Sequence, residues 1–291
     1  MIHIIKSDKL TVKITDYGAE LISAKGTDGF EYIWSADPTY WDQHAPVLFP
    51  VCGRILNGYY LYNGEKYEMD GHGFALKSSF EVVNSEENSL TLALKSSDET
   101  KKQYPFDFVL TATFTVNGDR LDVTFTVENK DQKVMPYMMG WHPGFNLENV
   151  GGSAIVDFKL KFDNVDKVCW YPLQHGCFCR PYGEDYALTN SEYALNEEEI
   201  YSNDTMIFTG TKERAVLYSS LEKHGIDMSW SKNLPYFCIW KETDANARFI
   251  CLEPWSGTPN DGETEENFNE RKMERLSSGA SETYSYSIKF N

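Results

Sequence analysis

A carboxylate stands at the end of a strongly apolar segment in the last sixth of the sequence. Glu253 follows residues 249–252 (Phe-Ile-Cys-Leu) and precedes Pro254. Burial at such a position would raise the pKa of the carboxyl group toward the range in which a general base works. Because an unpaired buried charge is costly, this side chain needs either a partner or a chemical role. We therefore predict that Glu253 is functional.

Two histidines stand beside residues that impose unusual backbone shapes. His72 lies between Gly71 and Gly73, which permit positive φ and a close approach to a ligand. His142 precedes Pro143, which disfavours helical geometry at the histidine. Imidazole is the side chain best matched to proton transfer near neutral pH. The alternatives are a turn histidine at position 72 and a structural histidine at position 142.

An arginine follows an apolar segment that is bounded by two prolines. Residues 46–54 read Pro-Val-Leu-Phe-Pro-Val-Cys-Gly-Arg, and Arg54 ends the run. A guanidinium group is a rigid fork of donors that suits sugar hydroxyls or carboxylates. A surface salt bridge is the alternative role for Arg54.

The elements that must position these residues are strands, because apolar residues alternate with polar ones. Residues 110–116 place threonines on one face and apolar side chains on the other, and the alternation resumes over 121–127. Asn117-Gly118 between the two runs predicts a β-hairpin. One buried face and one polar face are typical of antiparallel sheets.

Similar short strands recur along the chain, and long helical periods between them are missing. This spacing predicts an all-β fold, a large antiparallel β-sandwich in a single domain over residues 1–291. We expect a short helix at 37–41, where Pro38 would occupy the first turn, and a solvated loop or surface helix at 262–275. The further predicted strands are 10–15, 20–24, 31–34, 80–84, 89–95, 154–162, 214–219, 236–241, 247–252 and 282–290.

The charge balance excludes several classes of partner. The 291 residues include 27 Lys and Arg against 44 Asp and Glu, which gives a net charge of −17. Binding to nucleic acid or to an anionic membrane surface needs the opposite excess. The N-terminal residues do not form a signal peptide, and no apolar run is long enough to span a membrane. The sequence gives no indication of an oligomeric state.

The six cysteines do not form a metal-binding pattern. They are Cys52, Cys169, Cys177, Cys179, Cys238 and Cys251, and none forms a C-x-x-C pair. Several stand in apolar strands, where a thiol behaves as a small hydrophobic group. We therefore expect a reduced, cytoplasmic protein.

Together the four segments resemble the successive signatures of one family. Residues 46–54, His-Gly-Phe at 72–74, Trp-His-Pro-Gly-Phe at 141–145 and Leu-Glu-Pro-Trp-Ser-Gly at 252–257 look like those of the aldose 1-epimerase (galactose mutarotase-like) superfamily. The similarity is greatest to its LacX-like branch and covers nearly the whole length. The chain departs from the family at Ser278, where a proline is usual before the glycine.

The resemblance implies a supersandwich fold with a sugar in an open cleft, and a role for each matching residue. Glu253 matches the general base, His142 the general acid in its protonated form, and His72 the second histidine near the ring oxygen. Arg54 matches the arginine that binds sugar hydroxyls, and Asp204 is the candidate for the family's hydroxyl-binding aspartate. The implied activity is interconversion of the α and β anomers of an aldohexose, with no metal or other cofactor.

Three alternatives stay open at the level of sequence. A mutarotase of hexose 6-phosphates would need added cations near the cleft, for which Lys77 and Arg180 are candidates. A non-catalytic carbohydrate-binding or sugar-sensing protein could share the sandwich fold. A metalloenzyme could use His44, His72, His142 and Glu253 as ligands.

Overall fold

The alternation predicted around residue 117 forms the longest hairpin of the protein. The computed structural model describes residues 1–147, 149, 151–175, 177–203, 205–244 and 246–291. Strand β9 (Phe108–Asn117) pairs with β10 (Arg120–Asn129), which leaves Gly118 and Asp119 as a two-residue loop. Gly118 has φ of 60°, as the first loop position of a type II′ turn requires. The predicted hairpin is confirmed, with the loop one residue later than Asn-Gly.

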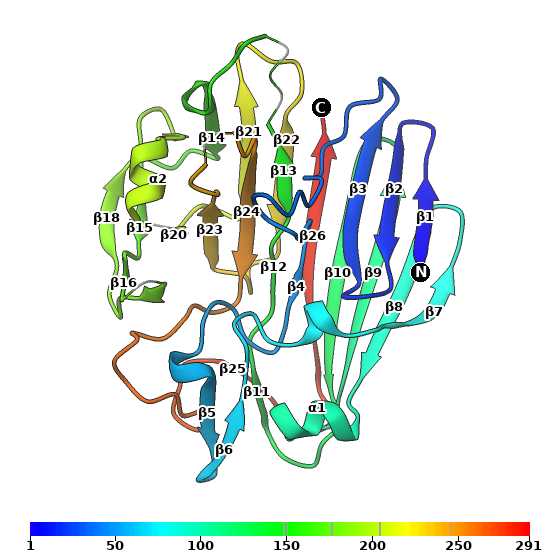
Figure 1. Ribbon diagram of the computed structural model, residues 1–291, viewed down its shortest axis with the longest axis vertical. Coiled ribbons are helices and arrows are strands. Elements are labelled where there is room, and N and C mark those ends of the chain that lie inside the picture. Colours follow the sequence, from blue (N-terminus) through cyan, green and yellow to red (C-terminus); the bar gives the residue numbers. More distant parts are fainter. Residues whose placement is uncertain (148, 150, 176, 204, 245) are drawn as a thin grey trace.

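This hairpin lies within a nine-stranded antiparallel sheet (Figure 1). Residues on β9 alternate between buried and partly exposed positions, so one face of the sheet belongs to the core. The remaining members of the sheet, in spatial order around β10 and β9, are β19 (Glu192–Ala194), β14 (Phe158–Phe162), β21 (Arg214–Ser219), β22 (Ile226–Trp230) and β26 (Ser281–Phe290) on one side and β8 (Ser89–Lys95) and β7 (Glu81–Ser85) on the other.

A second, eight-stranded antiparallel sheet contains the apolar segment that ends in the predicted carboxylate. Strand β24 (Phe249–Trp255) is buried along its whole length, as expected of an interior strand with covered faces. In spatial order the sheet is β18 (Glu184–Ala187), β15 (Lys167–Trp170), β20 (Thr205–Thr209), β23 (Tyr236–Trp240), β24, β12 (Gly140–Trp141) and β4 (Val47–Leu48), with β13 (Gly144–Asn146) also paired to β24.

Aromatic side chains join the two sheets face to face. Trp141 on β12 packs edge-on against Tyr286 on β26, with ring centroids 5.4 Å apart, and against Phe125 on β10 at 6.2 Å. The Tyr286 hydroxyl donates to the carbonyl of Pro254, which ties β26 to β24. All four residues are buried, and the architecture is therefore the predicted antiparallel β-sandwich.

Smaller elements complete the molecule (Figure 1). A three-stranded sheet contains β1 (Ile2–Lys6), β2 (Leu10–Thr15) and β3 (Glu20–Gly26). Two-stranded pairs are β5 (Tyr59–Tyr62) with β6 (Glu65–Glu68), β11 (Met135–Tyr137) with β25 (Glu274–Leu276), and β16 (Leu173–Gln174) with β17 (Phe178–Cys179). The helices are α1 (Asp98–Gln103), α2 (Glu197–Asn203) and the 3₁₀ turns η1 (Leu56–Gly58), η2 (Ala75–Lys77) and η3 (Ile155–Asp157).

Most predicted strands match observed ones, and two segments differ. The segment 31–34 makes only isolated bridges, through Glu31 and Ile33, and residues 155–157 of the predicted strand 154–162 form η3. At 37–41 the expected helix is a single turn, in which the amides of Tyr40 and Trp41 both donate to the Asp37 carbonyl. Segment 31–34 meets β3 and β13 through one bridge each, which is too little pairing to form a strand.

The segment 262–275 is mostly an irregular, solvent-facing loop, as predicted, but three of its side chains are buried. Phe268 and Glu266 are buried, and Arg271 is 9 % exposed. Nη1 of Arg271 donates to Oε2 of Glu266 at 2.8 Å, so the two charges are buried as a pair. A charged pattern can therefore conceal an internal ion pair whose partners only the fold brings together.

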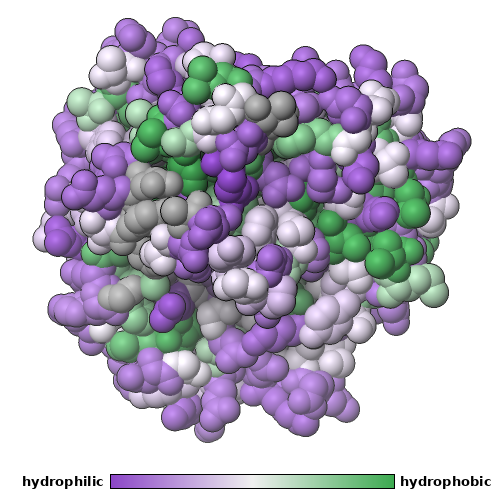
Figure 2. Space-filling view, turned by 45° about the horizontal axis from the view of Figure 1, so that its top comes forward, coloured by the Kyte–Doolittle hydropathy of each residue, from purple (hydrophilic) through white to green (hydrophobic). Residues whose placement is uncertain are grey.

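Hydrophilic side chains dominate the face shown in Figure 2, with hydrophobic ones gathered in small groups between them. This appearance agrees with the excess of acidic residues. Among the described residues, no helix is long and apolar enough to cross a membrane. All six cysteines are free thiols.

Candidate active site

Alternation along β24 turns one set of side chains to the core and the other to a cavity. Ile250 and Leu252 belong to the main hydrophobic core. Glu253 and Trp255, on the opposite face of the strand, line a cavity of about 270 Å³. The Glu253 side chain is fully buried. A strand of otherwise apolar residues thus places one carboxylate in the cavity wall.

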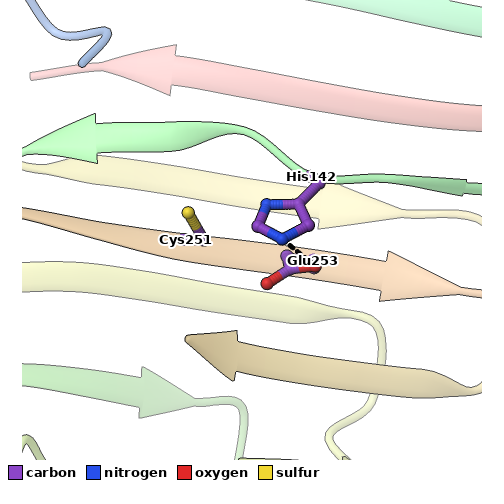
Figure 3. A group of neighbouring side chains, drawn as sticks. All are labelled: His142, Cys251 and Glu253. Carbon is purple, nitrogen blue, oxygen red and sulfur yellow. Dashed lines mark ion pairs between the residues drawn. The ribbon is translucent and has the colours of Figure 1, made fainter. Parts of the chain in front are cut away.

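His142 meets this carboxylate from the neighbouring segment of the sheet. It follows β12 directly, and its backbone N–H donates to the carbonyl of Pro46. Nε2 of His142 lies 3.2 Å from Oε2 of Glu253, and Figure 3 shows the imidazole directed at the carboxylate. Residues more than a hundred positions apart therefore form one acid–base contact in the cavity.

Aromatic rings hold the imidazole of His142 in place. Its centroid lies 5.0 Å from that of Trp41 and 5.7 Å from that of Trp240. Burial among these rings lowers the pKa of His142 well below its ordinary value, and the nearby His72 lowers it further. A carboxylate at contact distance has the opposite effect, because it favours imidazolium. The protonated His142 predicted from the sequence therefore depends on Glu253.

His72 is fixed by a pair of bonds to Gly53. The His72 N–H donates to the Gly53 carbonyl, and the Gly53 N–H donates to Nδ1 of His72 at 3.2 Å. Because Nδ1 is an acceptor, the neutral ring carries its proton on Nε2. Burial, followed by the charge of Arg54, lowers the pKa of His72 to about 4. His72 is therefore a neutral hydrogen-bond donor near pH 7.

The loop conformation that presents His72 requires the glycine beside it. His72 has φ of 64° and Gly73 has φ of 78°. A Cβ on Gly73 would lie 2.2 Å from the Phe49 carbonyl oxygen, so only glycine fits against this strand. The sequence pattern Gly-His-Gly anticipated this loop, although the histidine itself also adopts a positive φ.

Arg54 lies at the cavity wall with its side chain exposed to solvent. It is anchored by Gly53, against which Pro259 packs so closely that a Cβ at position 53 would lie 2.1 Å from the proline ring. The four predicted residues Arg54, His72, His142 and Glu253 thus line one cavity. Asp204, the fifth, lies outside the described residues, and its neighbour Thr205 lines the cavity.

Three tryptophans at the cavity were not singled out as site residues by the sequence. Trp41, Trp240 and Trp255 all line it. The indole N–H of Trp255 has no hydrogen-bond partner among the described residues. Trp255 lies two residues after Glu253, so strand alternation could have assigned it to the same face; no comparable signal marks Trp41.

The four metal ligands considered from the sequence do not come together, because His44 lies beside Glu20. Nδ1 of His44 lies 3.5 Å from Oε2 of Glu20, and the backbone N–H of His44 donates to the same carboxylate. A different group does: ligand atoms of His142, Cys251 and Glu253 lie within 4.8 Å of one another.

Nearly the whole chain matches a known enzyme family. The family model for aldose 1-epimerase matches residues 1–289. The chain belongs to the aldose 1-epimerase family. The β-sandwich and the cavity on its eight-stranded sheet are thus those of an aldose 1-epimerase family member.

Individual relatives agree with this family. The plasmid-encoded protein LacX of Lactococcus lactis subsp. lactis is 33% identical over 270 residues, which cover 87% of each chain. A galactose mutarotase related enzyme from Lactobacillus acidophilus is 29% identical, with a TM-score of 0.93 over 100% of this chain and 97% of the other. A galactose 1-epimerase from L. acidophilus NCFM is 16% identical, with a TM-score of 0.72 over 99% and 93%, which shows the shared fold.

Proposed function

We propose that this aldose 1-epimerase family member interconverts the α and β anomers of an unphosphorylated aldohexose by acid–base ring opening and closure. The observation that carries the proposal is the contact of 3.2 Å between His142 and the fully buried Glu253 at a cavity wall. A site that only binds neutral hydroxyls has no need of a matched acid and base in contact with each other. A reaction that removes one proton and supplies another needs both.

The reaction begins with a pyranose in the cavity. Glu253 accepts the proton of the C1 hydroxyl while His142 gives a proton to the ring oxygen, and the C1–O5 bond breaks. The open aldehyde turns about C1–C2. Reversal of the two proton transfers closes the ring on the other face, so no atom is gained or lost and no redox step occurs.

The surrounding donors orient the sugar. The neutral His72 presents Nε2–H, Arg54 offers its guanidinium group to hydroxyls, and the indole N–H of Trp255 offers a further donor. The tryptophan rings provide apolar faces for the C–H surface of a pyranose.

Anomer exchange can be followed directly. Fresh α-D-glucose and α-D-galactose are monitored by polarimetry, with the spontaneous rate subtracted, and exchange at equilibrium is measured by NMR. We expect a rate proportional to enzyme concentration for at least one of these aldohexoses. A protein that binds the sugars and leaves their anomerisation unchanged would instead be a carbohydrate-binding protein.

A hexose 6-phosphate is the second candidate substrate, and one observation favours it. A neighbouring cavity of about 320 Å³ shares Pro259 with the first and is lined by Arg180, Arg271 and Lys272. Arg271 is already paired with Glu266, and Asp261 and Glu274 line the same cavity. Lys77, the other cation considered, pairs with Asp70. Comparing kcat/KM for glucose and glucose 6-phosphate distinguishes the two substrates.

A further inference from the structure

The reactive contact has a third neighbour that ring opening does not use. Cys251 precedes Glu253 by two positions on β24, so both side chains leave the same face of the strand. Its Sγ, Nε2 or Nδ1 of His142 and a carboxylate oxygen of Glu253 all lie within 4.8 Å of one another (Figure 3). The three residues are buried, with His142 the most exposed at 9 %.

We propose that Cys251, His142 and Glu253 form a binding site for a thiophilic divalent cation such as Zn²⁺, whose occupation inhibits the enzyme. Thiolate, imidazole and carboxylate are the three ligand types that Zn²⁺ uses in proteins. The inhibition rests on the proposed function, whereas the binding of the metal does not.

The geometry requires one small adjustment. With Zn–N and Zn–O bonds of about 2.0–2.2 Å, a tetrahedral ion separates its nitrogen and oxygen ligands by roughly 3.4 Å. The observed 3.2 Å between Nε2 of His142 and Oε2 of Glu253 is close to this separation. The sulfur must come to about 3.6 Å from each of the other ligands. Rotation of the Cys251 side chain about its Cα–Cβ bond can supply that movement.

Charge and proton balance also favour the complex. The thiol of Cys251 and the imidazolium of His142 each lose a proton to solvent as the Zn–S and Zn–N bonds form, and no electron is transferred. The dication then faces one thiolate and one carboxylate, which leaves the buried site neutral. His142 and Glu253 line the cavity, so the fourth ligand position can be filled by water or a sugar hydroxyl from that side.

Occupation of this site removes both proton-transfer groups at once. A metal bound to the Glu253 carboxylate and to His142 Nε2 takes the electron pairs that must accept protons during ring opening and closure. Mg²⁺ and Ca²⁺ prefer oxygen ligands and should not compete with water for a thiol and an imidazole. Inhibition is therefore expected to be selective for Zn²⁺ over Mg²⁺.

The first test compares two buried cysteines near Glu253. Cys238 is paired with Glu253 across β23 and β24, but it is not part of the three-residue group, so Cys238→Ala is the matched control. We expect Zn²⁺ to inhibit the wild-type protein and Cys238→Ala equally, and EDTA to reverse the inhibition. Cys251→Ala should keep the basal rate while its inhibition constant for Zn²⁺ rises about tenfold or more. Cys251→Ser, which preserves the size of the side chain, serves if the alanine variant does not fold.

The second test measures binding without activity. Titration of the wild-type protein with Co²⁺ should produce a near-ultraviolet thiolate-to-cobalt absorption band, which Cys238→Ala retains and both Cys251 variants lose. Equal Zn²⁺ inhibition of the wild-type protein and the Cys251 variants, or a Co²⁺ spectrum without the thiolate band, would overturn the proposal. A protein without mutarotase activity would still give the Co²⁺ result, so failure of the proposed function is distinguishable.

Discussion

At the scale of single residues, the contact between Glu253 and His142 makes the two side chains one unit. Burial lowers the pKa of His142 well below its ordinary value, whereas a carboxylate 3.2 Å away favours the charged imidazole. Two ionisable groups at this distance interact, so the proton transfers belong to the pair and not to either residue alone. A change at Glu253 removes the base and also the negative charge beside His142.

This coupling predicts that losses of activity do not add. Glu253→Gln and His142→Asn should each reduce kcat by about 10²–10⁴. The double variant should lose little more than the more damaging single one, since groups that act as a unit are non-additive. Polarimetry on all three variants, with circular dichroism as the control for folding, measures this. Multiplying losses would mean that the two groups act independently.

The indole N–H of Trp255 carries a separate prediction about binding. It has no hydrogen-bond partner among the described residues, although its side chain lines the cavity. If it donates to a sugar hydroxyl in both ground and transition states, Trp255→Phe should raise KM about two- to tenfold with kcat nearly unchanged, the equivalent of one hydrogen bond. Initial rates over a range of sugar concentrations separate the two constants. An unchanged KM would exclude this contact.

At the scale of elements, the loops between strands position the cavity wall. The segment after β24 is held by Arg271, whose guanidinium donates to the Thr258 carbonyl as well as to Glu266. Pro259, the next residue, packs against Gly53 and so against the loop that ends in Arg54. The buried ion pair thus supports the cavity wall indirectly, through Thr258 and Pro259.

Breaking this ion pair should destabilise the protein in a pH-dependent way. Burial already raises the pKa of Glu266 despite the attraction of Arg271. In Arg271→Met the unpaired carboxylate should cost about 3–5 kcal/mol of unfolding free energy near neutral pH. A raised pKa in the folded state means that protons bind more tightly to that state, so stability falls as pH rises. The loss should therefore be smaller at about pH 5 than at about pH 8.

Urea unfolding of the wild-type protein and of Arg271→Met at both pH values tests this sign. Glu266→Gln combined with Arg271→Met should recover part of the stability, because no unpaired charge is then buried. A larger loss at the lower pH would contradict the assignment of the effect to Glu266.

At the scale of the whole molecule, the net charge of −17 acts on any anionic substrate. A negative field repels a sugar phosphate and leaves a neutral sugar unaffected. We expect kcat/KM for glucose 6-phosphate to be lower than for glucose and to rise with added salt, while the value for glucose stays constant. A fall with salt for the phosphate alone would show that the cations of the second cavity capture it, in favour of the second candidate substrate.

Local sequence patterns predicted where strands form better than they predicted which side chains are buried. The alternation around Gly118 was sufficient for the β9–β10 hairpin, because a strand period and a two-residue turn are properties of adjacent residues. The charges of 262–275 did not reveal that Glu266 and Arg271 are buried, because their neighbours, such as Leu61 and Met138, lie far away in the sequence. The helix expected at 37–41 is only a single turn for a similar reason. The ring of Trp41 packs against His142, which lies far away in the sequence.

The sequence by itself determined the strand-rich sandwich and the residue types able to move protons, since both depend on local order along the chain. Only the tertiary structure decided that Glu253 contacts His142, that Cys251 stands beside both, and that three tryptophans complete the cavity. The physical reason is that pairing between β24 and its neighbours joins segments more than a hundred residues apart. Contact distance and burial, which set the protonation of the pair, exist only once those strands have paired.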